Sequence, residues 1–87
     1  MKYSISNKIL WKAVDDEVVI VSENMENNSY LNRTASEVWR LIEKGLGIDE
    51  ICRKLAGKYG VKTIQIGKDV ECLIDDLLKS NIIKKIQ

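Results

Sequence analysis

The feature that most constrains the fold is a change in the spacing of apolar residues near residue 32. Before it, runs rich in β-branched and aromatic residues at 9–14, 17–22 and 28–32 are typical of short strands. After it, apolar residues recur at the spacing of amphipathic helices. Short connections between the strands favour an antiparallel meander. The sequence therefore predicts an α+β fold, a three-stranded antiparallel sheet followed by three helices stacked on one face.

Local signals mark the ends of these elements. Asp15-Asp16 is expected to form a tight turn between the first two strands, and the dense β-branched run that follows predicts a strand covered on both faces. Thr34 and Glu37 have the spacing of a capping box at the start of the first helix. Thr63 is expected to cap the third helix, and Asn81 can adopt the left-handed conformation that ends it.

Composition narrows the functional classes. The 87 residues suffice for one domain, residues 1–87, and no apolar run approaches the roughly 18 residues that span a membrane. No secretory signal opens the chain, so the cytoplasm is the expected location. The net charge of +1 does not favour a nucleic-acid partner, whose binding depends on clustered basic residues.

Nothing in the sequence specifies catalysis, a cofactor or a metal. Histidine is absent, which removes the commonest general base and excludes Cys–His and Ser–His–Asp arrangements. Cys52 lies in the apolar stripe of the second helix, where a buried, inert thiol is expected, and Cys72 points away from the apolar face of the third helix. Trp11 and Trp39 are expected to anchor the core. The chain is therefore predicted not to be an enzyme.

The third strand is the most informative feature for function. It lies at an edge of the meander and carries neither proline nor charge before Arg33, so its main chain is accessible. The short, strand-like tail at residues 82–86 could pair with it. Alternatively the edge is held open for strand addition, in which a peptide supplies the next strand. A proline at Ser29 or at Leu31 is expected to test strand addition, because proline cannot donate to a ladder. Only a residue whose amide points outward should respond, so one of the two should abolish binding while the chain stays folded.

Six segments carry a resemblance: Asp16-Glu17-Val18-Val19, Tyr30-Leu31-Asn32, Val38-Trp39, Asp49-Glu50-Ile51, Asp69-Val70, and Leu77 before Asn81-Ile82-Ile83. In this order and spacing they resemble the PqqD-like family, also called recognition elements of ribosomally made, post-translationally modified peptide pathways. The resemblance covers nearly the whole chain. Asn81 stands where the family usually has glycine, and Gly47 where serine or threonine is common; both can perform the capping role.

The resemblance implies a winged-helix-like module that binds the leader of a precursor peptide as a strand added along the third strand, beside the third helix. It also implies a partner enzyme that modifies the peptide, such as a radical SAM protein, a peptidase, a cyclase or a ligase. Helical phase alone leaves open which residues of the third helix line the groove and which fill the core. When the binding positions of the family are transferred to this sequence, the resemblance implies these peptide-binding residues: Asn28, Ser29, Tyr30, Leu31, Asp69, Val70, Leu73, Asp76 and Leu77.

Two other functions remain open at this point. A small winged-helix DNA-binding regulator is the main alternative, although the third helix carries Asp69, Glu71, Asp75 and Asp76, which would repel phosphate. A structural subunit or assembly factor is the other. The sequence does not identify the peptide pathway, and whether two copies form a homodimer by edge pairing is also left open.

Overall fold

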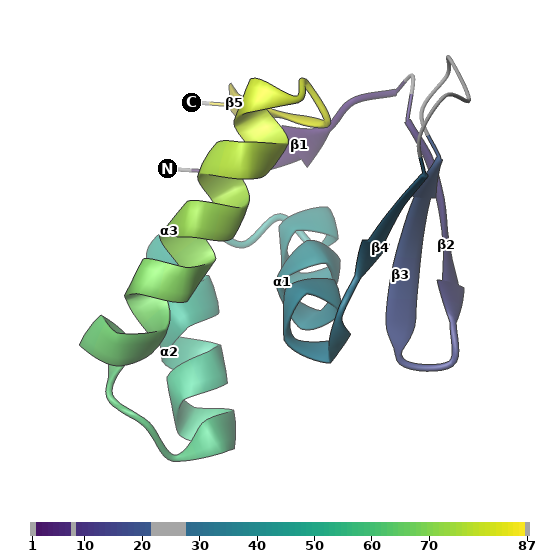
Figure 1. Ribbon diagram of the computed structural model, residues 1–87. Coiled ribbons are helices and arrows are strands. Elements are labelled where there is room, and N and C mark those ends of the chain that lie inside the picture. The colour runs from purple at the N-terminus through teal and green to yellow at the C-terminus, as the bar shows by residue number, and fades with distance from the viewer. Residues whose placement is uncertain (1, 8, 22–27, 87) are drawn as a thin grey trace.

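The computed structural model describes residues 2–7, 9–21 and 28–86, with the backbone alone at residues 28 and 29 (Figure 1). The predicted fold class is confirmed: a three-stranded antiparallel sheet of order β2-β3-β4 precedes three helices. The elements in chain order are β1 (Lys2–Ile5), β2 (Leu10–Val14), β3 (Glu17–Val21), β4 (Asn28–Leu31), α1 (Arg33–Glu43), α2 (Ile48–Tyr59), α3 (Thr63–Lys79) and β5 (Ile83–Ile86).

A second, two-stranded sheet joins the ends of the chain and was not predicted. The tail forms β5, as expected of a strand-like segment, but it pairs antiparallel with β1 and not with β4. Tyr3 and Ile83 turn inward from these strands and are 6% and 2% exposed. The α3 helix returns the chain to its start, so residues from opposite ends of the sequence share one ladder (Figure 1).

The meander begins with a two-residue turn at Asp15 and Asp16, as predicted. Asp15 has a positive φ of 57°, which hairpin turns of this length require and which aspartate tolerates. The Asp16 carboxylate accepts a 2.6 Å hydrogen bond from the Arg33 guanidinium at the start of α1. The turn is thus tied to the helix that packs on the sheet.

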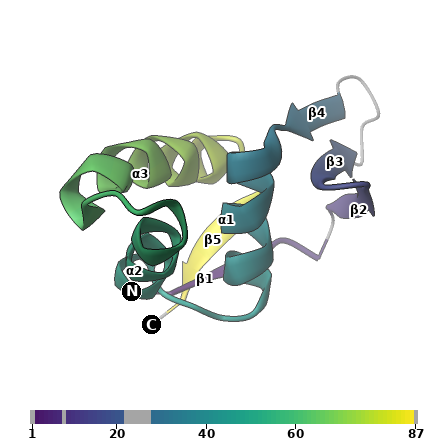
Figure 2. The ribbon, with the colours of Figure 1, turned by 90° about the horizontal axis from the view of Figure 1, so that it is seen from below.

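The helices cover only one face of the sheet (Figure 2). Val18 and Ile20 of β3 are buried on that face, whereas Val19 and Val21 on the other face are half-buried. The prediction that this strand is covered on both faces is therefore wrong. The rings of Trp11 and Trp39 meet edge to face, with centroids 5.7 Å apart, where the sheet contacts α1.

A buried hydroxyl connects the sheet to α1. Ser36 Oγ accepts a 2.8 Å hydrogen bond from the Val18 N–H and donates one of 3.1 Å to the Leu31 carbonyl. These two backbone groups face each other across β3 and β4, so the serine bridges a position where the strands would otherwise bond directly. Ser36 is 0% exposed, and water therefore cannot replace it.

Replacing Ser36 with alanine is expected to lower the free energy of unfolding by about 1–3 kcal/mol, because two buried backbone groups lose a partner. Chemical denaturation followed by tryptophan fluorescence would measure this change. Ser80→Ala is the matched control, because Ser80 is exposed at the end of α3 and its loss should cost less than about 0.5 kcal/mol. Equal unfolding free energies for the two variants would contradict the bridging role.

Two of the predicted helix caps differ from those observed. The first helix is capped by Asn32, whose side chain accepts from the Ala35 N–H at 2.8 Å, and not by Thr34. Glu37, the expected second half of a capping box, instead contacts Lys58 of α2 at 2.6 Å. The third helix begins at Thr63, but its N-cap is Lys62 and no side chain caps it. The left-handed conformation predicted for Asn81 is confirmed, with φ 59°.

Candidate functional site

A groove of about 420 Å³ lies between the first half of α1 and α3. Figure 2 shows α1 placed between α3 and the sheet, with β4 leading directly into its first turn. Helix α1 thus forms one wall, and α3 forms the other. The residues that line the groove are Asn32, Thr34, Ala35 and Val38, then Ile66, Asp69, Val70, Leu73 and Asp76.

Four of the five α3 residues predicted to bind peptide lie in this groove. Val70 is buried at its base, Leu73 is half-buried, and Asp69 and Asp76 stand exposed at its margins. These positions recur along one face of the helix, one or two turns apart. Leu77 does not line the groove; it is 5% exposed and belongs to the core. The structure thereby separates lining from core residues, which helical phase alone did not.

Sequence reasoning missed the α1 wall and Ile66. Neither Ala35 nor Val38 of α1 is among the residues predicted to bind peptide, yet both line the groove. A usable signal did exist: Asn32 and Thr34 immediately follow β4, so any peptide lying beside β4 must pass the first turn of this helix. Which α3 residues oppose that turn depends on how the two helices pack, and sequence spacing does not contain that information.

The direction of the backbone groups in β3 follows from the hairpin. Val14 and Glu17 face each other across the two-residue turn, so they exchange both of their backbone hydrogen bonds. Bonded and non-bonded pairs alternate along an antiparallel ladder. The N–H and C=O groups of Val18 and Ile20 must therefore point away from β2, toward β4. The hydrogen bond from the Val18 N–H to Ser36 agrees with this direction.

The same alternation assigns the backbone groups of β4. Leu31 and Ser29 stand opposite Val18 and Ile20, so their N–H and C=O groups point to β3. Those of Asn28 and Tyr30 point outward, where no strand in the described part of the chain pairs with them. The prediction that proline at either Ser29 or Leu31 would test strand addition is therefore wrong, because both amides serve the existing sheet.

The side chains of Tyr30 and Leu31 take opposite faces of the sheet. Leu31 turns inward and is 8% exposed, whereas Tyr30 is 74% exposed. Tyr30 lines a separate surface hollow on the uncovered face, together with Val19 and Lys12. The Tyr30 side chain is thus outside the groove, and the contribution of this residue to the edge is its main chain.

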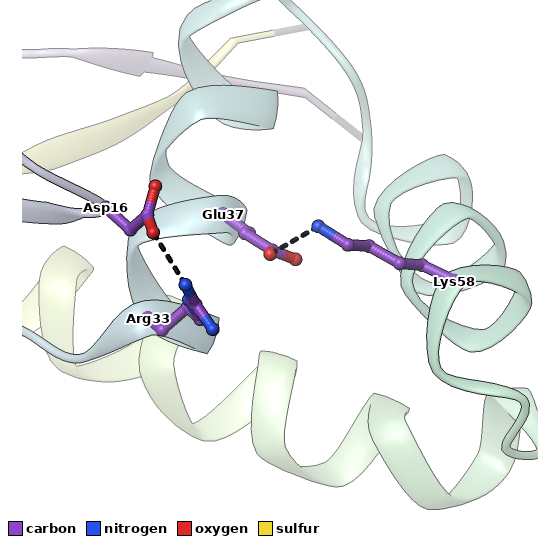
Figure 3. Close-up of polar contacts among 4 residues, drawn as sticks. All are labelled: Asp16, Arg33, Glu37 and Lys58. Carbon is purple, nitrogen blue, oxygen red and sulfur yellow. Dashed lines mark hydrogen bonds and ion pairs between the residues drawn. The ribbon is translucent and has the colours of Figure 1, made fainter.

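The basic residues near the start of α1 are held by carboxylates away from the groove (Figure 3). The 2.6 Å contact between Arg33 and Asp16 lowers the pKa of that aspartate, through the hydrogen bond and the charge of the guanidinium. The Glu37 carboxylate raises the pKa of Lys58 through its hydrogen bond. Both pairs line a different hollow, between the hairpin, α1 and α2.

The described residues contain no group of three or more histidine, cysteine, aspartate or glutamate side chains that could hold a metal ion. Within the same residues, no helix is long and apolar enough to cross a membrane. Cys72 is exposed, as expected. Cys52 is half-buried and not fully inside the core; burial, together with Asp49 and Glu71, raises the pKa of its thiol. A raised pKa disfavours the reactive thiolate.

Comparisons with known proteins agree on one fold. A family model described as "Coenzyme PQQ synthesis protein D (PqqD)" matches residues 17–83. The solved structure of TbiB1 in complex with the TbiA(beta) leader peptide is 24% identical, with a TM-score of 0.87 over 100% of this chain and 99% of that one. A lasso peptide synthetase B1 complexed with the leader peptide is 16% identical, with a TM-score of 0.87 over 98% of this chain and 100% of that one. No curated protein matches the sequence.

Proposed function

This chain belongs to the PqqD family, and on that premise we propose that it binds the leader of a ribosomally made precursor peptide and presents it to a modifying enzyme. Two proteins of the same fold are described as complexes with leader peptides, which supports this class of ligand. In our proposal the leader adds to β4 as a further strand of the β2-β3-β4 sheet. Its inward-facing side chains then enter the groove between α1 and α3.

The observation that carries the proposal is the free edge of β4. Asn28 and Tyr30 direct their N–H and C=O groups outward, so an added strand could form up to four main-chain hydrogen bonds there. Each contributes about 0.5–1.5 kcal/mol net, largely independent of the ligand's sequence. Specificity must then come from side chains, and alternate leader residues would face the groove because successive strand residues point to opposite faces.

The groove suits apolar side chains of such a strand. Val38, Ile66, Val70 and Leu73 provide an apolar base, and burying one aliphatic leader side chain against them is worth about 1.5–3 kcal/mol. Leu31, the inward-facing residue of β4, lies at the end of the strand next to this groove. A leader residue opposite Leu31 would turn the same way and enter the groove.

The proposed role is binding without catalysis. The absence of histidine removes the commonest general base. In the proposal a partner enzyme carries out the chemistry, and a radical SAM protein, a peptidase, a cyclase and a ligase are the candidates. DNA binding is less well supported, because the exposed face of α3 carries Asp69, Glu71 and Asp75, which repel phosphate.

The outer edge of β4 can pair with only one strand at a time. A bound leader should therefore dissociate any homodimer that forms through this edge.

A titration of the labelled protein with a synthetic precursor leader, followed by amide chemical shifts, tests this function. We expect the largest changes in β4, in the first turn of α1 and along Asp69–Asp76 of α3. The protein alone should leave the precursor chemically unchanged when the mixture is analysed by mass spectrometry. Shifts confined to α2 or to the Asp15-Asp16 turn, with β4 unmoved, would show that strand addition at this edge is wrong.

A further inference from the structure

Two carboxylates are the only charged groups among the residues that line the groove. Asp69 and Asp76 are seven residues apart on α3, which places them about 10 Å apart along the helix axis. Val70 and Leu73 lie between them. The groove therefore has an apolar centre with one negative charge near each end.

Neither carboxylate has an ion-pair or hydrogen-bond partner among residues 2–7, 9–21 and 28–86. Lys79 is three positions from Asp76 on α3 but forms no ion pair with it. Arg33, at the start of the opposite wall, is held by Asp16, and Lys68 lines a different hollow, between α2 and α3. Both carboxylates are thus available to form an ion pair with a ligand.

A structural role for these carboxylates would be to balance the N-terminus of α1, which has no acidic residue in its first turn. However, the Asn32 side chain already accepts from Ala35 there. If the carboxylates had a structural role, removing them would lower the stability of the protein even without a bound peptide. Stability therefore has to be measured separately from binding.

The spacing of the two carboxylates along α3 can be compared with the spacing of side chains along an added strand. Side chains two residues apart on a strand face the same way and are about 6.7 Å apart. An apolar side chain seated over Val70 and Leu73 would lie about 4 Å from Asp69 and about 7 Å from Asp76 along the helix axis, at most about one two-residue step of a strand. A lysine or arginine two residues away would therefore project toward one of them. Its aliphatic stem could cover the apolar base while its charged end meets the carboxylate.

Resting on the strand addition proposed above, we infer that the leader bound by this chain carries a lysine or arginine two residues from its apolar anchor, on the same face of the added strand, and that Asp69 and Asp76 select it. The carboxylates are specificity determinants, while the main-chain edge and the apolar base supply the affinity common to any leader. Because the carboxylates are exposed, each pair should change affinity by about two- to fivefold.

The test is selection from a displayed library of random peptides long enough to add one strand. It is carried out on the unchanged protein, on the double variant Asp69→Asn/Asp76→Asn, and on the control Asp75→Asn, which removes an exposed α3 carboxylate outside the groove. We expect the unchanged protein and the control to enrich an apolar residue with a basic residue two positions away. The double variant should keep the apolar residue and lose the basic one.

Enriched peptides are then synthesised with the basic residue or with glutamine in its place. The basic peptide should bind the unchanged protein several-fold more tightly, and this advantage should shrink between about 50 and 300 mM salt and be absent from the double variant. If the enriched peptides share an apolar residue but show no preference for lysine or arginine, this inference is wrong and the proposed function still stands. A double variant that loses stability without changing the selection would lead to the same conclusion. If no peptide is enriched, or if enriched peptides bind without contacting β4, the proposed function itself is wrong.

Discussion

Leader binding is expected to fall by about 100-fold when Tyr30 is replaced by proline. The Tyr30 N–H faces the open edge of β4, so proline removes a donor to the leader and leaves a leader carbonyl unpaired, which costs about 1–3 kcal/mol. The proline ring also occupies the space of the added strand. Because the Tyr30 side chain is 74% exposed and proline is tolerated on edge strands, the chain should remain folded. Fluorescence anisotropy with a labelled leader would measure the change.

Two companion variants isolate the amide. Tyr30→Ala removes the same side chain but keeps the N–H, and it should bind within a few-fold of the unchanged protein. Ser29→Pro removes an amide that faces β3, so it should destabilise the sheet itself, visible as a lower unfolding midpoint. If Tyr30→Pro and Tyr30→Ala bind the leader equally well, the leader does not pair with this edge.

Truncating Leu73 is expected to be the largest side-chain effect on binding. Leu73 is half-buried between the two aspartates of the groove, so it is available to a ligand yet only partly involved in the core. Leu73→Ala should weaken leader binding by about 1–3 kcal/mol, or roughly 5- to 150-fold. Titration calorimetry would record the loss, together with a smaller negative heat capacity change on binding.

Leu78→Ala is the matched control for this prediction. Leu78 is also a half-buried leucine of α3 that packs against the core, but it does not line the groove. It should lower stability by an amount similar to that of Leu73→Ala and leave leader affinity unchanged. Similar losses of affinity in the two variants would show that Leu73 acts through the stability of α3 and not through the groove.

The elements of this protein were readable from local patterns because local geometry determines them. The alternation of apolar residues before residue 32 and their helical spacing after it correspond to the sheet and to α1, α2 and α3. Asp15-Asp16 formed the expected turn, and Asn81 adopted the left-handed conformation. The capping box did not form because Asn32, two residues earlier, caps α1 and places Thr34 within the helix. The Glu37 carboxylate instead contacts Lys58, 21 residues away.

By itself the sequence determined the order of the three-stranded meander and the three helices and the family resemblance, and it left the third strand either open or paired by the tail. Only the tertiary structure decided that the tail pairs with β1, so that β3 is the one strand paired with β4 in the described part of the chain, since pairing between distant strands depends on where α3 carries the chain. It also decided that Leu73 faces the groove and Leu77 the core. Both leucines fit one apolar stripe, and the rotation of α3 against its neighbours, set by packing, assigns each to its side.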